Sequence, residues 1–422
     1  MGIEGAEIRR AERWKLSKNE EQTDRSWGQH VDGRFRLNST SVTWVAQSHP
    51  VFFIFTKHIT VKATKARVTK DALFSRVENE CGSVPPHEGR RIYFGRIDPY
   101  LIAGCEVALD VNERTASELQ VVSNAFLRHI LGVHENSTVA FLYSEMGITP
   151  LPYRRLLLAL SYLRYLLFLP GRHYASLALR ASLLLTRNGA PSWFGDLLHV
   201  LQRLAPHASF SWRDDLTVDD VLELIDVVEV AAERSLANVI DSSPKGRLLR
   251  GFYNDIPIPR TLVKFMAKSP KPAAYKTYLN LPIPTHRKAF TRLLMSAHTL
   301  GIEVLRRKER YRPFVPRRWR LCRFCRVMVE DEPHALLECR ANDGLFRRRR
   351  RFIQDITAVI PEITDLWSSP CSLIEQLWFL LRVANIEGLL AKFIHDVLAI
   401  YNDVPVYVAP LALWADSPAI QE

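Results

Sequence analysis

The sequence predicts a mainly α-helical protein of 422 residues. Apolar residues recur at helical spacing in several long stretches, and residues that favour helix caps stand at the ends of two of them. Hydrophobic residues make up 47% of the chain and charged residues 24%, which is typical of a globular protein and excludes a wholly disordered one. The sequence has no repeat with a period of about 20 to 50 residues, so it does not indicate a solenoid.

The first predicted helices follow a polar N-terminal stretch. Residues 1–43 hold 8 basic and 7 acidic residues with little apolar periodicity, so we expect a solvated, poorly ordered tail there. Residues 57–77 place Ile59, Ala63 and Ala66 on one face of a helix, which the prolines at 85 and 86 must stop. A second helix is predicted over 113–131 with Gly132 as its C-terminal cap, and a third follows Pro152.

A fourth helix and a proline-rich segment come next. Thr217, with Asp220 three residues later, predicts the start of a helix that reaches about residue 240. Six prolines then fall between positions 257 and 284, a density that forbids a long helix and suggests an extended linker or an irregular surface segment. A helix over about 286–305 and two C-terminal helices near 372–381 and 386–401 complete the prediction.

These patterns divide the chain into six predicted regions. They are the polar tail 1–43, a helical domain 44–200, a helical region 201–256, the Pro-rich linker 257–285, a basic segment with a Cys/His cluster 286–351, and C-terminal helices 352–422.

The cysteines and the apolar stretches indicate the compartment. Six cysteines are too few for a secreted disulfide scaffold, and the N-terminus has mixed charge without an apolar signal region. The most apolar stretch, 156–169, contains Arg164 and is shorter than the roughly 18 residues that a membrane span needs. We therefore expect an intracellular protein, nuclear or cytoplasmic or both, that is neither secreted nor bound in a membrane.

Three of the cysteines belong to a pattern typical of a metal site. Cys322, Cys325, His334 and Cys339 have the spacing Cys-x2-Cys-x8-His-x4-Cys. Thiolates and an imidazole suit tetrahedral zinc, and four protein ligands leave no position for water, so the sequence predicts one structural Zn²⁺. Asp331 and Pro333 predict a helix start at His334, and that helix must loosen before Cys339, because residues five apart on an α-helix point about 140° away from each other. The alternative is a small hydrophobic core in which the cysteines are buried without metal.

Most of the positive charge surrounds this cluster. The chain carries a net charge of +12, and residues 306–351, with 16 Lys and Arg against 6 Asp and Glu, account for +10 of it. Guanidinium groups can bind phosphates in a forked geometry while flat rings stack on unpaired bases, so the segment predicts binding of RNA or DNA. The alternative is a solvated basic face. The predicted nucleic-acid-binding residues are Arg306, Arg307, Lys308, Arg310, Arg312, Arg317, Arg318, Trp319, Arg320, Arg323, Arg326, Arg347, Arg348, Arg349, Arg350 and Arg351.

Three stretches resemble the proteins of non-LTR, LINE-type retrotransposons, particularly fungal copies, in the portion that follows the polymerase palm. They read RIYFGRIDPYLIAGCEVALDV from position 91, FLRHILGVHENSTVAFLYSEMGITPLPYRRLLLALSYLRYLL from 126, and PTHRKAFTRLLMSAHTLGIEVLRRKERYRPFVPRRWRLCRFCRVMVEDEPHALLEC from 284. The resemblance implies a helical thumb-like region followed by a zinc knuckle of the CCHC type that grips RNA or target DNA. It also implies that Lys62, Lys65 and Lys70 follow a template-primer backbone, although three lysines on a helix are equally typical of a solvated face.

The chain departs from this family where catalysis would take place. Reverse transcription needs two metal ions held by palm carboxylates, normally in a Phe/Tyr-Ala-Asp-Asp hairpin, and that string is absent. Asp214 and Asp215 follow an arginine and precede a helix start, so we expect a solvated turn there. We therefore expect a nucleic-acid-binding protein without an enzymatic site or a small-molecule substrate. Two alternatives stay open: a reverse transcriptase whose palm is supplied in trans by another chain, and a relic without function.

Overall fold

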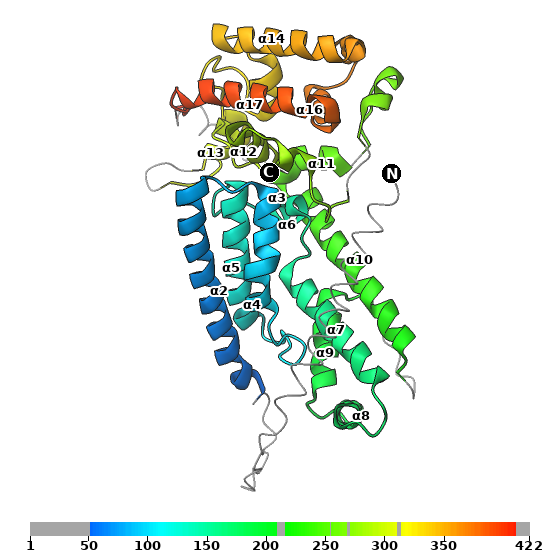
Figure 1. Ribbon diagram of the computed structural model, residues 1–422. Coiled ribbons are helices and arrows are strands. Elements are labelled where there is room, and N and C mark those ends of the chain that lie inside the picture. Colours follow the sequence, from blue (N-terminus) through cyan, green and yellow to red (C-terminus); the bar gives the residue numbers. More distant parts are fainter. Residues whose placement is uncertain (1–50, 209–215, 254, 268–270, 310–313, 411–422) are drawn as a thin grey trace. The chain divides into compact units, whose positions relative to one another are not determined.

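The computed structural model describes residues 51–208, 216–253, 255–267, 271–309 and 314–410. In these ranges the regular elements are helices, with isolated β-bridges such as the one between Leu321 and Val329, so the predicted mainly α fold is confirmed (Figure 1). The predicted tail 1–43 and the pair Asp214-Asp215 lie outside the described residues. In the same ranges, no helix combines the length and apolar character that crossing a bilayer requires.

The N-terminal helices pack around α5. They are α2(Val51–Cys81), α3(Pro86–Ile92), the π-helical turn η1(Tyr93–Ile97), α4(Asp98–Ile102), α5(Glu113–Leu131) and α6(Val139–Met146). The long helix α2 lies along α5 and buries the predicted face of Ile59, Ala63 and Ala66. Gly132 ends α5 at φ 66°, the left-handed cap that the sequence predicts.

A second core forms between α7 and α10. Its helices are α7(Leu151–Phe168), α8(Tyr174–Arg187), α9(Trp193–Leu204) and α10(Val218–Ser242). Thr217 and Asp220 cap α10 reciprocally, as predicted: the Asp220 amide donates to the threonine hydroxyl, and the Thr217 amide donates to the aspartate carboxylate at 2.9 Å. The first half of α10 packs on α7. Leu236 and Ile240 in its second half belong instead to the main core, which contains buried residues of the N-terminal helices and of the C-terminal helices, so α10 joins the two cores.

The segment after α10 is irregular but packed. It contains η2(Pro244–Gly246), α11(Arg247–Tyr253) and the 3₁₀ turns η3(Arg260–Phe265) and η4(Thr277–Asn280). Within the Pro-rich stretch 257–285, Leu262, Tyr278 and Leu279 are buried in the main core. The stretch therefore contributes core side chains as well as connecting helices.

The C-terminal helices form a stack in which α17 contacts both α12 and α14 (Figure 1). The elements are α12(Pro284–Leu294), α13(Gly301–Val304), η5(Arg317–Trp319), the π-helical turn η6(His334–Glu338), α14(Asp343–Val359), η7(Pro361–Ile363), α15(Thr364–Ser368), α16(Leu373–Arg382), η8(Ala384–Ile386) and α17(Glu387–Asn402). The helices predicted near 372–381 and 386–401 correspond to α16 and α17.

The single helix predicted over 286–305 is wrong, because the chain breaks between α12 and α13. Ser296 takes a left-handed φ of 50°, and its hydroxyl donates to the carbonyl of Lys245 at 2.9 Å. His298 then accepts a hydrogen bond from the amide of Leu300 at its Nδ1. Contacts with distant residues thus override a helical pattern in the local sequence.

Gly147 at the end of α6 offers a test of this packing. It has a φ of 60°, and a Cβ there would lie 2.3 Å from the backbone nitrogen of Tyr275. We expect Gly147→Ala to lower the free energy of unfolding by about 2–4 kcal/mol in urea titrations, from left-handed strain plus the clash. Gly82→Ala, at φ 73° with no atom within 4 Å, should lose only about 1–2 kcal/mol. Equal losses would contradict the close approach.

Candidate metal centre

Cys322 and Cys325 lie in a tight loop closed by backbone hydrogen bonds. The amide of Arg326 donates to the carbonyl of Cys322 at 2.8 Å, and the amide of Cys322 donates to the carbonyl of Met328 at 2.8 Å. Arg326 adopts a left-handed φ of 56°, a conformation that favours glycine, and its guanidinium lies over the ring of Tyr407. The loop therefore turns sharply enough to present both sulfurs on one side.

The other two ligands come from a π-helical turn. Asp331 caps it by accepting a hydrogen bond from the amide of His334 at 3.1 Å. The amide of Cys339 donates to the carbonyl of His334 at 2.8 Å, five residues back, which is the bond of a π turn. The predicted cap and the predicted loosening of the helix are both confirmed, and the wider turn brings His334 and Cys339 to the same site.

The four side chains meet in one compact cluster. Their ligand atoms all lie within 4.8 Å of one another; the Sγ atoms of Cys322 and Cys339 are 3.7 Å apart, and Sγ of Cys325 lies 3.4 Å from Nε2 of His334. Tetrahedral coordination with metal–sulfur bonds of about 2.3 Å sets the sulfurs about 3.8 Å apart. The spacing of the cluster fits this geometry, so these residues could hold a metal ion.

Hydrogen bonds orient and ionise the ligands. Nδ1 of His334 lies 2.8 Å from a carboxylate oxygen of Glu338, which leaves Nε2 facing the cysteines. The contact between the two thiols lowers the pKa of Cys339 to about 7 and raises the pKa of Cys322 to about 11. Burial disfavours the charged form of His334, but its hydrogen bonds to Cys322 and Glu338 outweigh that effect and raise its pKa to about 9. A thiolate of Cys339 is therefore accessible at neutral pH, whereas a metal ion would have to displace the proton of His334 on binding.

The structure corrects the predicted nucleic-acid-binding set at three arginines. Arg320, Arg323 and Arg349 are buried and donate to backbone carbonyls inside the protein, where they cannot meet a phosphate. Arg323 also forms a buried ion pair with Glu330 at 2.6 Å. Sequence spacing could not separate these arginines from their exposed neighbours.

Arg349 on α14 donates hydrogen bonds to the turn that carries His334 and Cys339 of the candidate cluster. Its Nε donates to the carbonyl of Leu336 at 2.8 Å, and its terminal nitrogen donates to the carbonyl of Cys339 at 3.1 Å. The buried stripe of α14 contains Leu345, Arg349 and Phe352, because these positions recur at helical spacing. The third arginine of the five-residue run therefore points inward.

Most of the remaining predicted cations lie on the surface. Arg306 and Arg317 are partly exposed and pair with Glu303 and Asp331, and Trp319 is also partly exposed. Arg310 and Arg312 lie outside the described residues. The exposed members are Arg307, Lys308, Arg318, Arg326, Arg347, Arg348, Arg350 and Arg351.

The lysines assigned to a template-primer backbone lie on α2. Lys65 is exposed, Lys62 is half-buried, and Lys70 pairs with Asp71 at 2.9 Å. Their placement does not distinguish a nucleic-acid contact from a solvated face, and both stay predictions.

Sequence reasoning missed helix α14 and two supporting residues of the cluster. The signals for α14 were available in Asn342 as an N-cap, whose side chain accepts from the amide of Leu345, and in the apolar spacing that follows. Glu338 stands four residues after His334, a spacing that favours contact on a helix. Tyr401, whose hydroxyl lies 3.6 Å from Sγ of Cys322, arrives from α17 and left no signal near the cluster in the sequence.

The inward arginine can be tested within its own run. We expect Arg349→Gln to lower the free energy of unfolding by about 2–3 kcal/mol, since two buried carbonyls lose a charged donor. Arg350→Gln, at the adjacent exposed position, should change it by less than about 0.5 kcal/mol. Urea denaturation of both variants measures the difference, and similar values would contradict the inward placement.

Comparison with protein-family models, curated proteins and solved structures yields no match. No relative therefore assigns a role to the cluster. What the protein does must be inferred from the four candidate ligands and the charges around them.

Proposed function

We propose that this protein binds RNA or single-stranded DNA through the exposed cations of residues 306–351, and that Zn²⁺ held by the four ligands stabilises that region. The observation that carries the proposal is the position of the cluster inside the basic segment. Cys339 is followed after three residues by α14, which displays four exposed arginines. A folded metal centre would fix the direction in which those arginines point.

The donor set favours zinc over other metals. Three thiolates and one imidazole are soft or borderline ligands, whereas Mg²⁺ and Ca²⁺ prefer oxygen. With four protein ligands the coordination of Zn²⁺ is complete, which is typical of structural sites. The residues present fit the ion, and its chemical contribution is to hold the loop and the π turn together.

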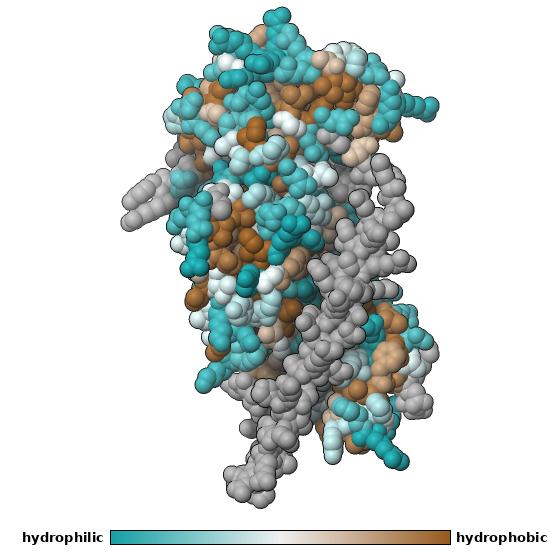
Figure 2. Space-filling model, viewed as in Figure 1, coloured by the Kyte–Doolittle hydropathy of each residue, from teal (hydrophilic) through white to brown (hydrophobic). Residues whose placement is uncertain are grey.

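The outer face of α14 has the properties of a phosphate-binding surface. Arg347, Arg350 and Arg351 are exposed three and four residues apart, so they share one side of the helix. Phe346 beside them is 50% exposed. In Figure 2 hydrophilic side chains gather along the upper edge, where Figure 1 places α14. Arginine binds phosphate oxygens in a forked geometry, and an exposed ring next to it can stack on an unpaired base.

The proposal agrees with the resemblance to the post-palm part of retrotransposon proteins. In that family the knuckle grips nucleic acid while another part of the protein carries the polymerase site. Under this interpretation the chain supplies binding without catalysis of its own.

Metal content tests the zinc assignment. We expect purified protein to contain about one zinc per chain and Cys322→Ser to lose it, because the site loses one of four ligands. Cys371→Ser is the matched control, since Cys371 lies outside the cluster. Elemental analysis by mass spectrometry gives the ratio, and equal zinc in wild type and Cys322→Ser would rule out the site.

The salt dependence of binding tests the interface. If about six cations meet phosphates of a single strand, the log–log slope of affinity against salt should be near −4. The triple variant R347Q/R350Q/R351Q should make that slope shallower by about 2 in fluorescence anisotropy titrations.

A control of equal charge comes from α8. The variant R172Q/R180Q/R187Q removes three exposed arginines, two on α8 and one just before it. Its log–log salt slope should match that of the wild type. A flat salt dependence of the wild type, or equal effects of both triple variants, would contradict the proposed interface.

A further inference from the structure

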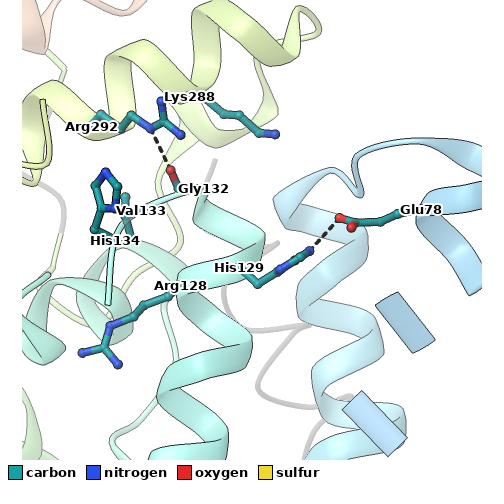
Figure 3. A pocket seen from close by; sticks show the side chains of 8 residues that line it. All are labelled: Glu78, Arg128, His129, Gly132, Val133, His134, Lys288 and Arg292. Carbon is teal, nitrogen blue, oxygen red and sulfur yellow. Dashed lines mark hydrogen bonds and ion pairs between the residues drawn. The ribbon is translucent and has the colours of Figure 1, made fainter. Parts of the chain in front are cut away.

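A second concentration of positive charge lies outside the basic segment, in an open recess of about 340 Å³ at the C-terminal end of α5. Figure 3 shows Lys288 and Arg292 on α12 facing the end of α5, with His129 reaching toward Glu78 of α2. The lining side chains are Glu78, Arg128, His129, Val133, His134, Lys288 and Arg292, with Gly132 at the centre.

The recess has more positive charge than the surrounding carboxylates balance. Glu78 is the one carboxylate in the lining, and it is already engaged with Nε2 of His129 at 2.7 Å. Glu135 acts on Arg128 electrostatically but does not line the recess. Arg128, Lys288 and Arg292 are the basic side chains that line it.

The end of α5 accounts for part of this charge. A helix C-terminus carries about half a negative charge, and basic residues near it are stabilising. Arg292 donates from Nε to the carbonyl of Gly132 at 2.7 Å, and Arg128 donates to the carbonyl of Ser137 at 3.1 Å. The aliphatic part of the Lys288 side chain packs against Gly132. A Cβ built on Gly132 would lie 3.2 Å from Cδ of Lys288.

Two donors of the recess do not pair with the carbonyls at the end of α5. Nε of Arg128 is buried and lacks a hydrogen-bond partner in the part of the chain that the structure describes. Burial also lowers the pKa of Arg128, the sign of a cation incompletely compensated by its surroundings. No carboxylate of the lining lies within ion-pair distance of Lys288. The ammonium of Lys288 and the terminal nitrogens of the exposed Arg292, which donates to Gly132 through Nε, are therefore the lining cations within reach of an anion from outside.

We propose that this recess holds a backbone phosphate of a nucleic-acid strand, as a contact separate from residues 306–351. The inference rests on the proposed function and adds a second place where the strand is held. The helix α12, which carries Lys288 and Arg292, packs on α17, and α17 packs on α14 with its exposed arginines. The recess and the basic face thus belong to one stack of helices.

The shape and lining favour a passing strand over an enclosed small molecule. Small-molecule sites are concave, mostly apolar and largely closed around the ligand. Here Val133 is the one apolar side chain of the lining, and His129, His134 and Arg292 are exposed. Positively charged grooves that follow the backbone are typical of proteins that bind single strands.

The test compares charge removal in the recess with equal removal elsewhere. The variant K288Q/R292Q should make the log–log salt slope for a fluorescein-labelled 20-nucleotide RNA shallower by about 1.4, which corresponds to two lost contacts with a single strand. The matched control is R260Q/K264Q on η3, which removes one exposed arginine and one lysine outside the recess and should leave the slope unchanged.

A second measurement uses the unmodified protein and does not depend on how a variant folds. The rate of Lys288 acetylation, followed by mass spectrometry, should fall several-fold when the RNA is added, while the rate at Lys264 stays constant. An unchanged slope together with unprotected Lys288 would overturn the recess contact but leave the proposed function standing. Protection by inorganic phosphate without protection by RNA would overturn its assignment to a nucleic-acid strand. Absence of any RNA binding by the wild type would overturn the proposed function as well.

Discussion

The buried ion pair between Arg323 and Glu330 is the constraint on which the candidate metal centre depends. Glu330 accepts from the amide of Arg323 at 2.7 Å and from the amide of Gly301 at 2.6 Å, so it ties the loop to the start of α13. The guanidinium also donates to the carbonyls of Thr299, Tyr401 and Val404, which lie before α13 and at the end of α17. Removing one partner of such a pair typically costs about 3–5 kcal/mol, because the other charge stays buried. The loop that carries Cys322 is thereby held to the helical stack by hydrogen bonds that need no metal.

Arginine has two opposite roles in the same short segment. Arg320, Arg323 and Arg349 fill carbonyl-lined positions beside the cluster, and each satisfies backbone groups that a small irregular region cannot pair in helices or sheets. Their exposed neighbours lie on the surface, although Arg326 lies over Tyr407 and Arg348 pairs with Asp396. A net charge counted along the sequence therefore overstates the charge available to a ligand. The same reasoning shows why a few cations of α5 and α12, unremarkable in the sequence, form a concentrated positive recess once the helices are packed.

The sequence predicted the features that depend on neighbours along the chain. Gly132 and the Thr217–Asp220 box marked helix ends through their own backbone chemistry, and the turn geometry between His334 and Cys339 required the loosening that the π turn provides. Features that depend on distant contacts could not be predicted. The break at Ser296 is held by the carbonyl of Lys245, and the inward direction of Arg349 depends on carbonyls of the π turn. The four candidate ligands were found because metal coordination imposes a spacing, whereas nucleic-acid contacts impose none.

The π turn gives the candidate metal centre an asymmetric tolerance to insertions and deletions. An α-helical turn brings residues four apart to within about 40° of each other, and the π turn brings residues five apart to the same side. Losing one of the residues between His334 and Cys339 would allow the turn to relax to an ordinary helix with both ligands still on one side. Gaining one would carry the cysteine away from the site. The five-residue spacing of the π turn is thus the upper limit that the four ligands can accept. A one-residue deletion between His334 and Cys339 should be tolerated, whereas a one-residue insertion should not.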